Sequence, residues 1–246
     1  MIHSLWDTFL YHPLVNALVF LASIIPGGDI GIAIIILTLF VKILIFPLSQ
    51  RSIESQAKMN ILSPELKKIK DMGVNKEEQA RLTFELYKKH QTNPFSGCLL
   101  VLIQIPVIFA LYFVFLKGVN FNPDVIYSFI KAPAQINTMF LGFIDISQKS
   151  LALALLAAIS QYFQAHFMSK PPVSADDGSF QSSLSRSMHT QMKYFFPVLI
   201  FIILYTDWFG VSTSGAVALY WIVSNIFAIS QQIYAEKKNK QAPVLS

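Results

Sequence analysis

Five long apolar segments dominate this chain, and they constrain its fold more than any other feature. A hydrocarbon core about 30 Å thick is crossed by roughly 20 apolar residues in a helix. Lipid offers no partner to an open backbone, so each segment is predicted to be a helix. Only 13% of the 246 residues are charged, whereas a soluble domain averages about 25%. The sequence therefore predicts an all-α polytopic membrane protein, whose five transmembrane helices are Ile30–Leu48, Gly97–Leu116, Leu151–Phe167, Tyr194–Tyr205 (extendable to Phe209) and Gly215–Ile233.

A shorter apolar stretch, Leu14–Ile25, precedes these segments and ends at Pro26-Gly27-Gly28. It is too short to span, and the absence of a preceding Lys or Arg does not fit a signal peptide. We expect Pro13–Ile25 to form an interfacial amphipathic helix, with Trp6 and Tyr11 near headgroup level. A sixth transmembrane helix is the alternative.

Positive charge is distributed unevenly along the chain. Residues 1–29 contain no Lys or Arg, whereas residues 51–89 contain nine. Cytoplasmic loops carry the excess of Lys and Arg in membrane proteins. The predicted topology therefore places the N-terminus outside, and the loops 49–96 and 169–193 and the C-terminus in the cytoplasm.

The basic loop that follows the first span has helical periodicity of its own. Arg51–Met72 and Lys76–His90 each repeat apolar residues at helical spacing. Ser63-Pro64-Glu65 is typical of an N-cap, Ser63, followed by Pro at the first helical position, and so predicts a kink or a new helix start. Gly73-Val74-Asn75 predicts the turn between the two helices. We expect a cytoplasmic helical hairpin over residues 49–92.

Polar side chains gather in the inner half of the predicted spans. At 1.5 Å per residue, Lys42 lies roughly 18 Å from the outer end of its helix, with Thr38 one turn away on the same face. A cation there costs roughly 2.5–3.5 kcal/mol on insertion scales and marks a functional site. No predicted span carries Asp or Glu in its interior, so we expect Lys42 to attract negative charge from outside the spans. Other polar residues at this depth are Gln104, Ser160, Gln161, Gln164, Ser224, Asn225 and Ser230.

These polar residues predict a hydrophilic groove that admits water from the cytoplasm and closes before the outer face. A second interpretation remains open from the residues alone. Gln and Ser between membrane helices commonly serve as packing contacts, and the long stem of Lys42 could carry its charge to the inner interface.

Several motifs resemble the YidC/Oxa/Alb family of membrane insertases, and the resemblance covers nearly the whole chain, from about residue 12 to residue 235. The motifs are Phe46-Pro47-Leu48, Leu62-Ser63-Pro64-Glu65, Asn93-Pro94-Phe95-Ser96-Gly97-Cys98, Leu102-Ile103-Gln104-Ile105-Pro106, and Ser214-Gly215 with Leu219-Tyr220-Trp221-Ile222-Val223-Ser224-Asn225. The resemblance implies a bacterial inner-membrane protein with a five-helix core and a cytoplasmic hairpin. It also implies a groove, open to cytoplasm and lipid, that passes short hydrophilic stretches of nascent proteins across the bilayer.

The chain departs from the family's pattern at two places. Lys42 stands where the family usually has arginine, so the charge is kept but the fork that binds a carboxylate with two hydrogen bonds is lost. The residues before Ile30 are few, and the tail ends soon after Lys240. These lengths predict a minimal member, in which ribosome docking through the tail is weakened.

The predicted organisation has three parts: an external N-terminal segment (1–29), a five-helix insertase core with its hairpin and loop (30–235) and a short basic cytoplasmic tail (236–246). Nothing indicates an enzyme or a cofactor, since the sequence has no phosphate-binding glycine loop, no HExxH motif and no acid pair in the spans. We expect a substrate-binding groove lined by Lys42, Thr38, Gln104, Gln161, Gln164, Tyr220, Trp221, Ser224 and Asn225.

The expected partners are nascent membrane proteins and the lipid bilayer. The family resemblance adds the ribosome and the Sec translocon, and we expect the protein to act as a monomer. The alternative function is a small secondary transporter or channel, against which stand the missing intramembrane acids and the absence of a visible inverted repeat. A chaperone that holds membrane proteins without inserting them is a third possibility.

Overall fold

The computed structural model describes residues 6–92, 125–130, 136–168, 190–206 and 213–241, together with residues 105, 109, 113, 114 and 187. The predicted span Gly97–Leu116, with Gln104, lies outside the described residues apart from four isolated positions. The described chain is almost entirely helical. Its elements are η1 (Asp7–Tyr11), α2 (His12–Ile24), η2 (Pro26–Gly28), α3 (Ile30–Ile61), α4 (Ser63–Asp71), α5 (Lys76–Lys89), β1 (Met139–Phe140), β2 (Ile144–Asp145), α7 (Leu151–Phe167), η5 (Gln191–Phe195), α9 (Phe196–Tyr205) and α10 (Gly215–Gln241).

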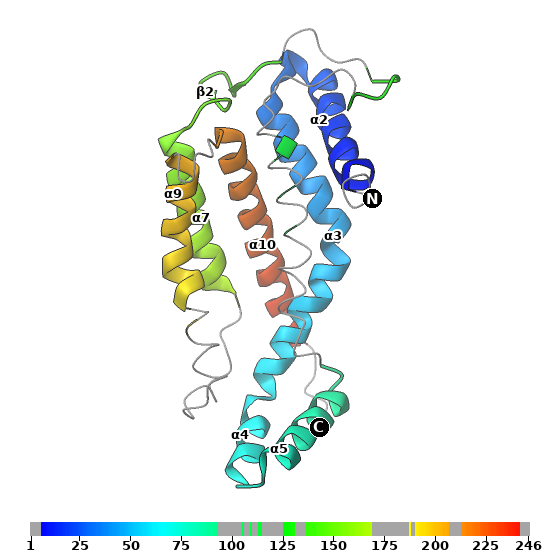
Figure 1. Cartoon of the computed structure of the whole chain (residues 1–246), viewed down its shortest axis with the longest axis vertical. Coiled ribbons are helices and arrows are strands. Elements are labelled where there is room, and N and C mark those ends of the chain that lie inside the picture. Colours follow the sequence, from blue (N-terminus) through cyan, green and yellow to red (C-terminus); the bar gives the residue numbers. More distant parts are fainter. Residues whose placement is uncertain are drawn as a thin grey trace.

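The apolar helices form one bundle in which α10 lies between α3 on one side and the pair α7 and α9 on the other (Figure 1). Helix α2 packs against α3. The core draws apolar side chains from all five of these helices, and Ala33, Ala154 and Ala157 within it are fully buried. Small residues let helices approach closely in a membrane, where packing is a main source of association energy.

Three described helices have the length and composition to cross a membrane: Asp7–Ile24, Ile30–Ser55 and Gly215–Lys238. Leu151–Phe167 and Gln191–Tyr205 are shorter apolar helices. The chain is thus an all-α protein with the apolar helices of a membrane protein. The prediction that five helices span it stays a prediction.

Two helices run past the ends predicted for them. Helix α3 continues without interruption from Ile30 to Ile61, so Arg51–Ile61 belongs to this helix and not to a separate one that begins after Leu48. Its 32 residues measure about 48 Å, which exceeds the hydrocarbon core. Pro47 lies inside α3 and does not end it, although a proline removes one backbone hydrogen bond. Helix α10 likewise continues past Ile233 to Gln241.

Two π-turns, each placed just before a proline, lengthen their helices at the N-terminal end. The backbone N–H of His12 donates to the carbonyl of Asp7 ahead of Pro13, and Phe196 donates to Gln191 ahead of Pro197. The wider turn relieves the clash between a proline ring and the carbonyl four residues earlier. The expected extension of the fourth apolar segment toward Phe209 was wrong, because α9 ends at Tyr205 and Thr206 is extended.

The first π-turn overturns the argument that the N-terminal apolar segment is too short to span. Together η1 and α2 form an 18-residue helix, which passes the length test. Whether this helix spans the membrane is better judged from its position in the bundle than from its length. Helix α2 lies beside only the upper part of α3 in Figure 1, and the side chain of Asn16 at its centre binds the loop residues Val125 and Tyr127.

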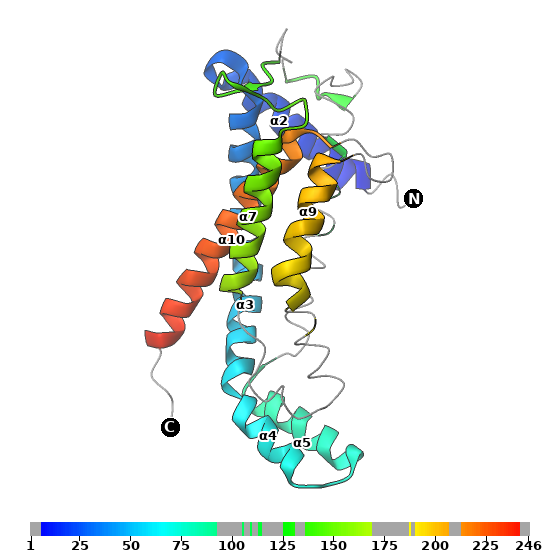
Figure 2. The same cartoon turned by 90° about the vertical axis from the view of Figure 1, so that its left-hand side faces the viewer.

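Helices α4 and α5 extend beyond the bundle at the end where α10 also terminates (Figure 2). Gly73 adopts a φ of 64° in the turn between them, a left-handed conformation that glycine favours. Asn75 caps α5, because its side-chain oxygen accepts a hydrogen bond of 2.8 Å from the Glu78 N–H. Helix α4 begins with Leu62 as its N-cap, one residue before the Ser63 cap that the sequence suggested.

The opposite end of the bundle is fastened by the segment 136–148. The N–H of Ile30 donates to the carbonyl of Asn137, and those of Gly215 and Ala216 donate to Gln148 and Ile146. A side chain at Gly31 would collide with the ring of Phe140, so α3 approaches this loop through a glycine. The starts of α3 and α10 are therefore tied to the same loop.

Candidate functional site

Polar side chains from α7 and α10 form a hydrogen-bonded network inside the bundle, centred on Gln161. Trp221 Nε1–H donates to Gln161 Oε1 at 2.8 Å, and Asn225 Nδ2 donates to the same oxygen at 3.4 Å. Asn225 also donates to Ser160 Oγ at 3.0 Å, and Gln161 Nε2 donates to Gln164 Oε1 at 3.1 Å. Gln161 and Asn225 are both buried. The structure thus brings together four of the predicted groove residues: Gln161, Gln164, Trp221 and Asn225.

Helical spacing explains how these residues meet. Trp221 and Asn225 are four apart on α10, and Gln161 and Gln164 are three apart on α7, so each pair shares one face of its helix. The network satisfies buried polar groups that lipid would leave without partners. The hydrogen bonds of the network join α7 to α10, so the network contributes to helix packing.

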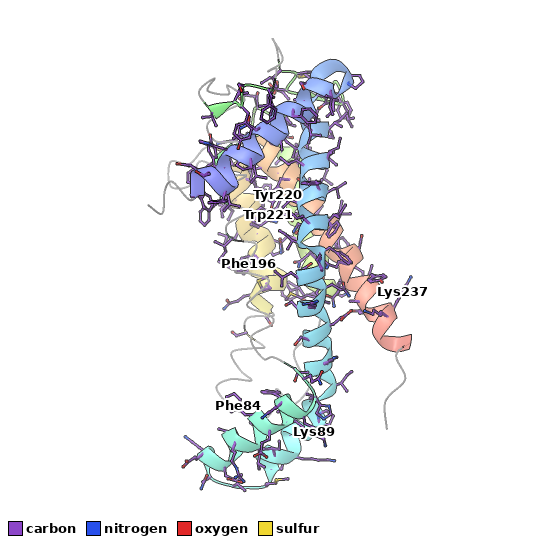
Figure 3. All side chains as sticks on the ribbon, turned by 90° about the vertical axis from the view of Figure 1, so that its right-hand side faces the viewer. Phe84, Lys89, Phe196, Tyr220, Trp221 and Lys237 are labelled. Atoms are coloured by element: carbon purple, nitrogen blue, oxygen red, sulfur yellow. The ribbon has the colours of Figure 1, made fainter. Side chains whose placement is uncertain are left out.

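The remaining predicted groove residues that the structure describes lie on α3 (Thr38, Lys42) and α10 (Tyr220, Ser224). Thr38 is buried and donates to the carbonyl of Ile34 in its own helix at 2.6 Å. Tyr220 and Ser224 are buried on α10, and Figure 3 places Tyr220 and Trp221 in the middle of the bundle beside α3. Lys42 is half-buried on α3, one turn from Thr38. Gln104 lies outside the described residues.

A second polar cluster, which the sequence did not reveal, joins the C-terminal parts of α3 and α10. Gln231 Nε2 donates to Ser49 Oγ at 2.7 Å, and more weakly to Gln50 Oε1 at 3.5 Å. Gln50 in turn donates to Glu54, whose carboxylate also accepts a charge-assisted hydrogen bond of 2.8 Å from Lys238. In the sequence these residues follow the apolar runs and look like solvated helix ends. Only the packing of α10 on α3 makes them partners.

Two buried polar side chains at the loop end of the bundle, Asp29 and Asn16, were not among the residues predicted from the sequence. Asp29 Oδ1 accepts hydrogen bonds from the Gly31 and Ile32 N–H groups, and its Oδ2 accepts one from Leu141 at 2.8 Å. Asn16 binds the loop residues named above. Asp29 directly before an apolar run is an N-cap signal that could have been used. These contacts close the bundle at the loop end.

Within the part of the chain that the structure describes, no group of three or more His, Cys, Asp or Glu side chains could hold a metal ion. The fold and site together define a helical integral membrane protein with hydrogen-bonding groups deep between apolar helices.

Comparison with known proteins identifies the class more closely. The profile of a family described as 60Kd inner membrane protein matches residues 20–242. The chain belongs to this family, which confirms the resemblance to the YidC/Oxa/Alb insertases.

The relatives differ in length. A protein of Magnetococcus marinus named Membrane protein insertase YidC is 33% identical over 239 residues, which cover 97% of this chain and 37% of that protein. A protein of the same name from Fusobacterium nucleatum is 29% identical over 94% of this chain and 98% of its own length. Membrane protein insertase MisCA of Bacillus subtilis is 26% identical over 92% of this chain and 77% of its own length. The chain therefore spans little more than a third of the Magnetococcus protein and nearly all of the Fusobacterium protein.

Proposed function

We propose that this protein is a membrane protein insertase that moves short hydrophilic segments of nascent membrane proteins into the bilayer without nucleotide hydrolysis. The observation that carries the proposal is the polar network between the apolar helices α7 and α10. The family match over residues 20–242 supports it. Relatives that carry the name insertase support the same function.

The network gives a physical basis for such a reaction. A hydrophilic segment that leaves water loses hydrogen bonds, and each polar group transferred without a partner costs several kcal/mol. Gln161, Gln164 and Asn225 carry amide groups that both donate and accept hydrogen bonds. In our proposal they exchange their mutual bonds for bonds to the passing segment, in a groove that Thr38, Gln104, Tyr220 and Ser224 complete. Trp221 and its apolar neighbours release the hydrophobic flank of the client to lipid.

Lys42 supplies the electrostatic part of the proposal. It lies in α3 twelve positions after Ile30, or roughly 18 Å along the helix. A cation at this depth attracts acidic residues of the client, because two unit charges 4 Å apart interact by about 4 kcal/mol at an effective dielectric constant of 20. The charge thus favours the entry of segments that the apolar walls would otherwise reject.

We propose that the groove opens to the cytoplasm and to lipid and is closed on the outer side. The loop end of the bundle supports this, because Asp29, Asn16 and Thr213 all bond across elements there. The positive charges of residues 51–89 favour the opposite end as cytoplasmic. The N-terminus then lies outside and the C-terminus inside the bacterial inner membrane, and α2 lies in the outer interface.

The α4–α5 hairpin is the part that we propose captures clients or contacts a partner such as the ribosome or the Sec translocon. Figure 3 shows Phe84 and Lys89 on α5, well away from the bundle. Phe84 is 65% exposed, and an aromatic residue beside basic ones is suited to a partly apolar, acidic peptide. We further propose that the chain works as a monomer, organised as segments 1–29, 30–235 and 236–246.

Reconstitution of the purified full chain in liposomes tests the proposal. The readout is protease protection of a small single-span client, supplied with either an acidic or a neutral translocated segment. We expect the parent chain to insert both clients and Lys42→Ala to slow the acidic one by about tenfold, equivalent to roughly 1.4 kcal/mol. Lys42→Arg should insert the acidic client at least as fast as the parent chain, because arginine binds a carboxylate with two hydrogen bonds.

The matched control is Lys58→Ala, which removes an exposed lysine from the same helix beyond its apolar part. It should leave both clients unaffected. Equal slowing of the acidic and neutral clients by Lys42→Ala would assign Lys42 a folding role. Solute flux through the liposomes without client insertion would favour a transporter or channel instead.

A further inference from the structure

Lys193 of η5 lies beside two tyrosine rings, where the C-terminal end of α7 meets the start of α9. Lys193 Nζ lies 5.7 Å from the ring centre of Tyr162 and 5.4 Å from that of Tyr194. The two tyrosine rings are 6.2 Å apart, and His166 stacks on Tyr162 at 6.3 Å. Cation–π contacts of this kind leave the three N–H donors of a lysine able to bind a further group.

A π-turn puts Lys193 in this place. The residue lies in η5, four positions before Pro197, where a regular helix would press the proline ring against the Lys193 carbonyl. The extra residue of the π-turn changes the direction of the side chains before the proline, and η5 packs against α7. Single π-turns within α-helices occur frequently at functional sites.

Among the described residues of α7, η5 and α9, none is an acidic counterpart for the charge of Lys193. Residues 151–168 and 190–206 contain no Asp or Glu. In the described part of the chain, the contacts of Lys193 are the two tyrosine rings, and none of the ion pairs found there includes it. Within the described residues of α7, η5 and α9, Lys193 therefore contributes an unbalanced positive charge.

Exposed aromatic side chains surround the lysine at the same level. Phe163, Phe167, Tyr194 and Phe195 are each between 37% and 57% exposed. Phe196, labelled in Figure 3, marks the lower end of α9. Exposed aromatic rings at the ends of apolar helices lie at the headgroup level of a membrane. Lys193 is thus at the depth where lipid phosphates are found.

We propose that Lys193, His166 and the hydroxyl groups of Tyr162 and Tyr194 form a binding site for the phosphate of an anionic phospholipid in the inner leaflet. Basic pockets between membrane helices on the cytoplasmic side bind anionic headgroups. The 15 residues of η5 and α9 measure about 23 Å, which is less than the hydrocarbon core. A bound headgroup at this point holds the lower end of a short helix at the membrane surface. The proposal rests on the membrane location and the topology proposed above, and not on insertase activity.

Lipid binding to the delipidated full chain in detergent tests the site. The probes are short-chain phosphatidylglycerol, short-chain phosphatidylcholine and inorganic phosphate, and the readout is the number and affinity of bound lipids by native mass spectrometry. We expect the parent chain to prefer phosphatidylglycerol, and Lys193→Gln to lose about fivefold of that preference, equivalent to the roughly 1 kcal/mol that a basic residue contributes near an anionic surface. Lys193→Arg should keep the preference.

Two further variants guard against a folding defect. Tyr194→Phe keeps the exposed ring and removes a hydroxyl group, and it should lower the affinity for phosphatidylglycerol by about twofold to tenfold. Lys237→Gln, which removes an exposed lysine at the end of α10, should change nothing. An unaltered preference in Lys193→Gln and Tyr194→Phe would show that the lysine only joins α7 to η5. Equal affinity of the parent chain for the two lipids, or displacement by inorganic phosphate at matching concentration, would also overturn the proposal.

Discussion

The bond between Trp221 and Gln161 should contribute measurably to the stability of the bundle. Trp221→Phe removes the indole N–H that donates to Gln161 Oε1 at 2.8 Å, and keeps an aromatic ring. The oxygen then retains only the longer bond of 3.4 Å from Asn225. Gln161→Leu removes the acceptor and leaves the indole N–H of Trp221 without this partner. Hydrogen bonds between membrane helices contribute about 0.6 kcal/mol on average and up to about 1.7 kcal/mol, so we expect a coupling energy of about 1 kcal/mol.

A double-mutant cycle measures this coupling. The parent chain, the two single variants and the double variant are unfolded reversibly in mixed micelles by adding SDS, and the loss of helix is followed by circular dichroism. A second cycle pairs Gln161→Leu with Trp6→Phe, whose ring lies before α2 and outside the network. That control cycle should be additive within about 0.5 kcal/mol. A coupling below about 0.3 kcal/mol in the Trp221 cycle would refute the importance of the bond.

The same variants distinguish the two roles that the polar residues can have. If the network serves only to pack α7 on α10, Gln161→Leu lowers stability and leaves client insertion unchanged at equal folded fraction. If it lines the groove, insertion of clients with polar translocated segments slows as well. We expect the second outcome.

Two further predictions concern regions outside the network. Asp29→Ala should lower the free energy of unfolding by roughly 1–3 kcal/mol, because it removes an N-cap and the hydrogen bond that Asp29 accepts from the Leu141 N–H. Asp29→Asn should lower it less, because the amide oxygen still accepts hydrogen bonds. Equal unfolding curves for Asp29→Ala and the parent chain would contradict this prediction. Burial raises the pKa of the Tyr87 phenol above its ordinary value, so the folded state favours the protonated form, and the stability of the α4–α5 hairpin should fall as pH rises above about 10. Proteolysis of the hairpin across a pH series measures the loss, which should be smaller in Tyr87→Phe; identical profiles for the two chains would argue against it.

Local signals in the sequence were enough to locate most helices. Helix α7 has the bounds Leu151–Phe167 that hydrophobicity alone predicted. Signals of this kind act over a few residues, and so they can be recognised in one sequence. The family also followed from short motifs, and the match over residues 20–242 confirmed it.

Helix ends and contacts between side chains of different helices were harder to predict from the sequence. Helix α3 continues through Pro47 instead of ending there, and the π-turns before Pro13 and Pro197 lengthen the helices that contain these prolines. In a soluble protein a proline often marks the end of a helix. In lipid a helix that ended there would expose unpaired backbone groups, so the helix continues and neighbouring groups satisfy the carbonyl that the proline leaves unpaired. The balance between these effects depends on packing, which the sequence does not show.

The sequence by itself determined that the chain is a helical membrane protein of the insertase family, because apolar length, charge asymmetry and motifs are properties of consecutive residues. The tertiary structure alone decided that Gln161 meets Trp221 and Asn225, that Gln231 meets Ser49, and that Asp29 holds the loop at Leu141. The physical reason lies in the rotation of each helix about its own axis. A period of 3.6 residues shows which side chains share a face, but the packing of the whole bundle decides which face of which neighbour they meet.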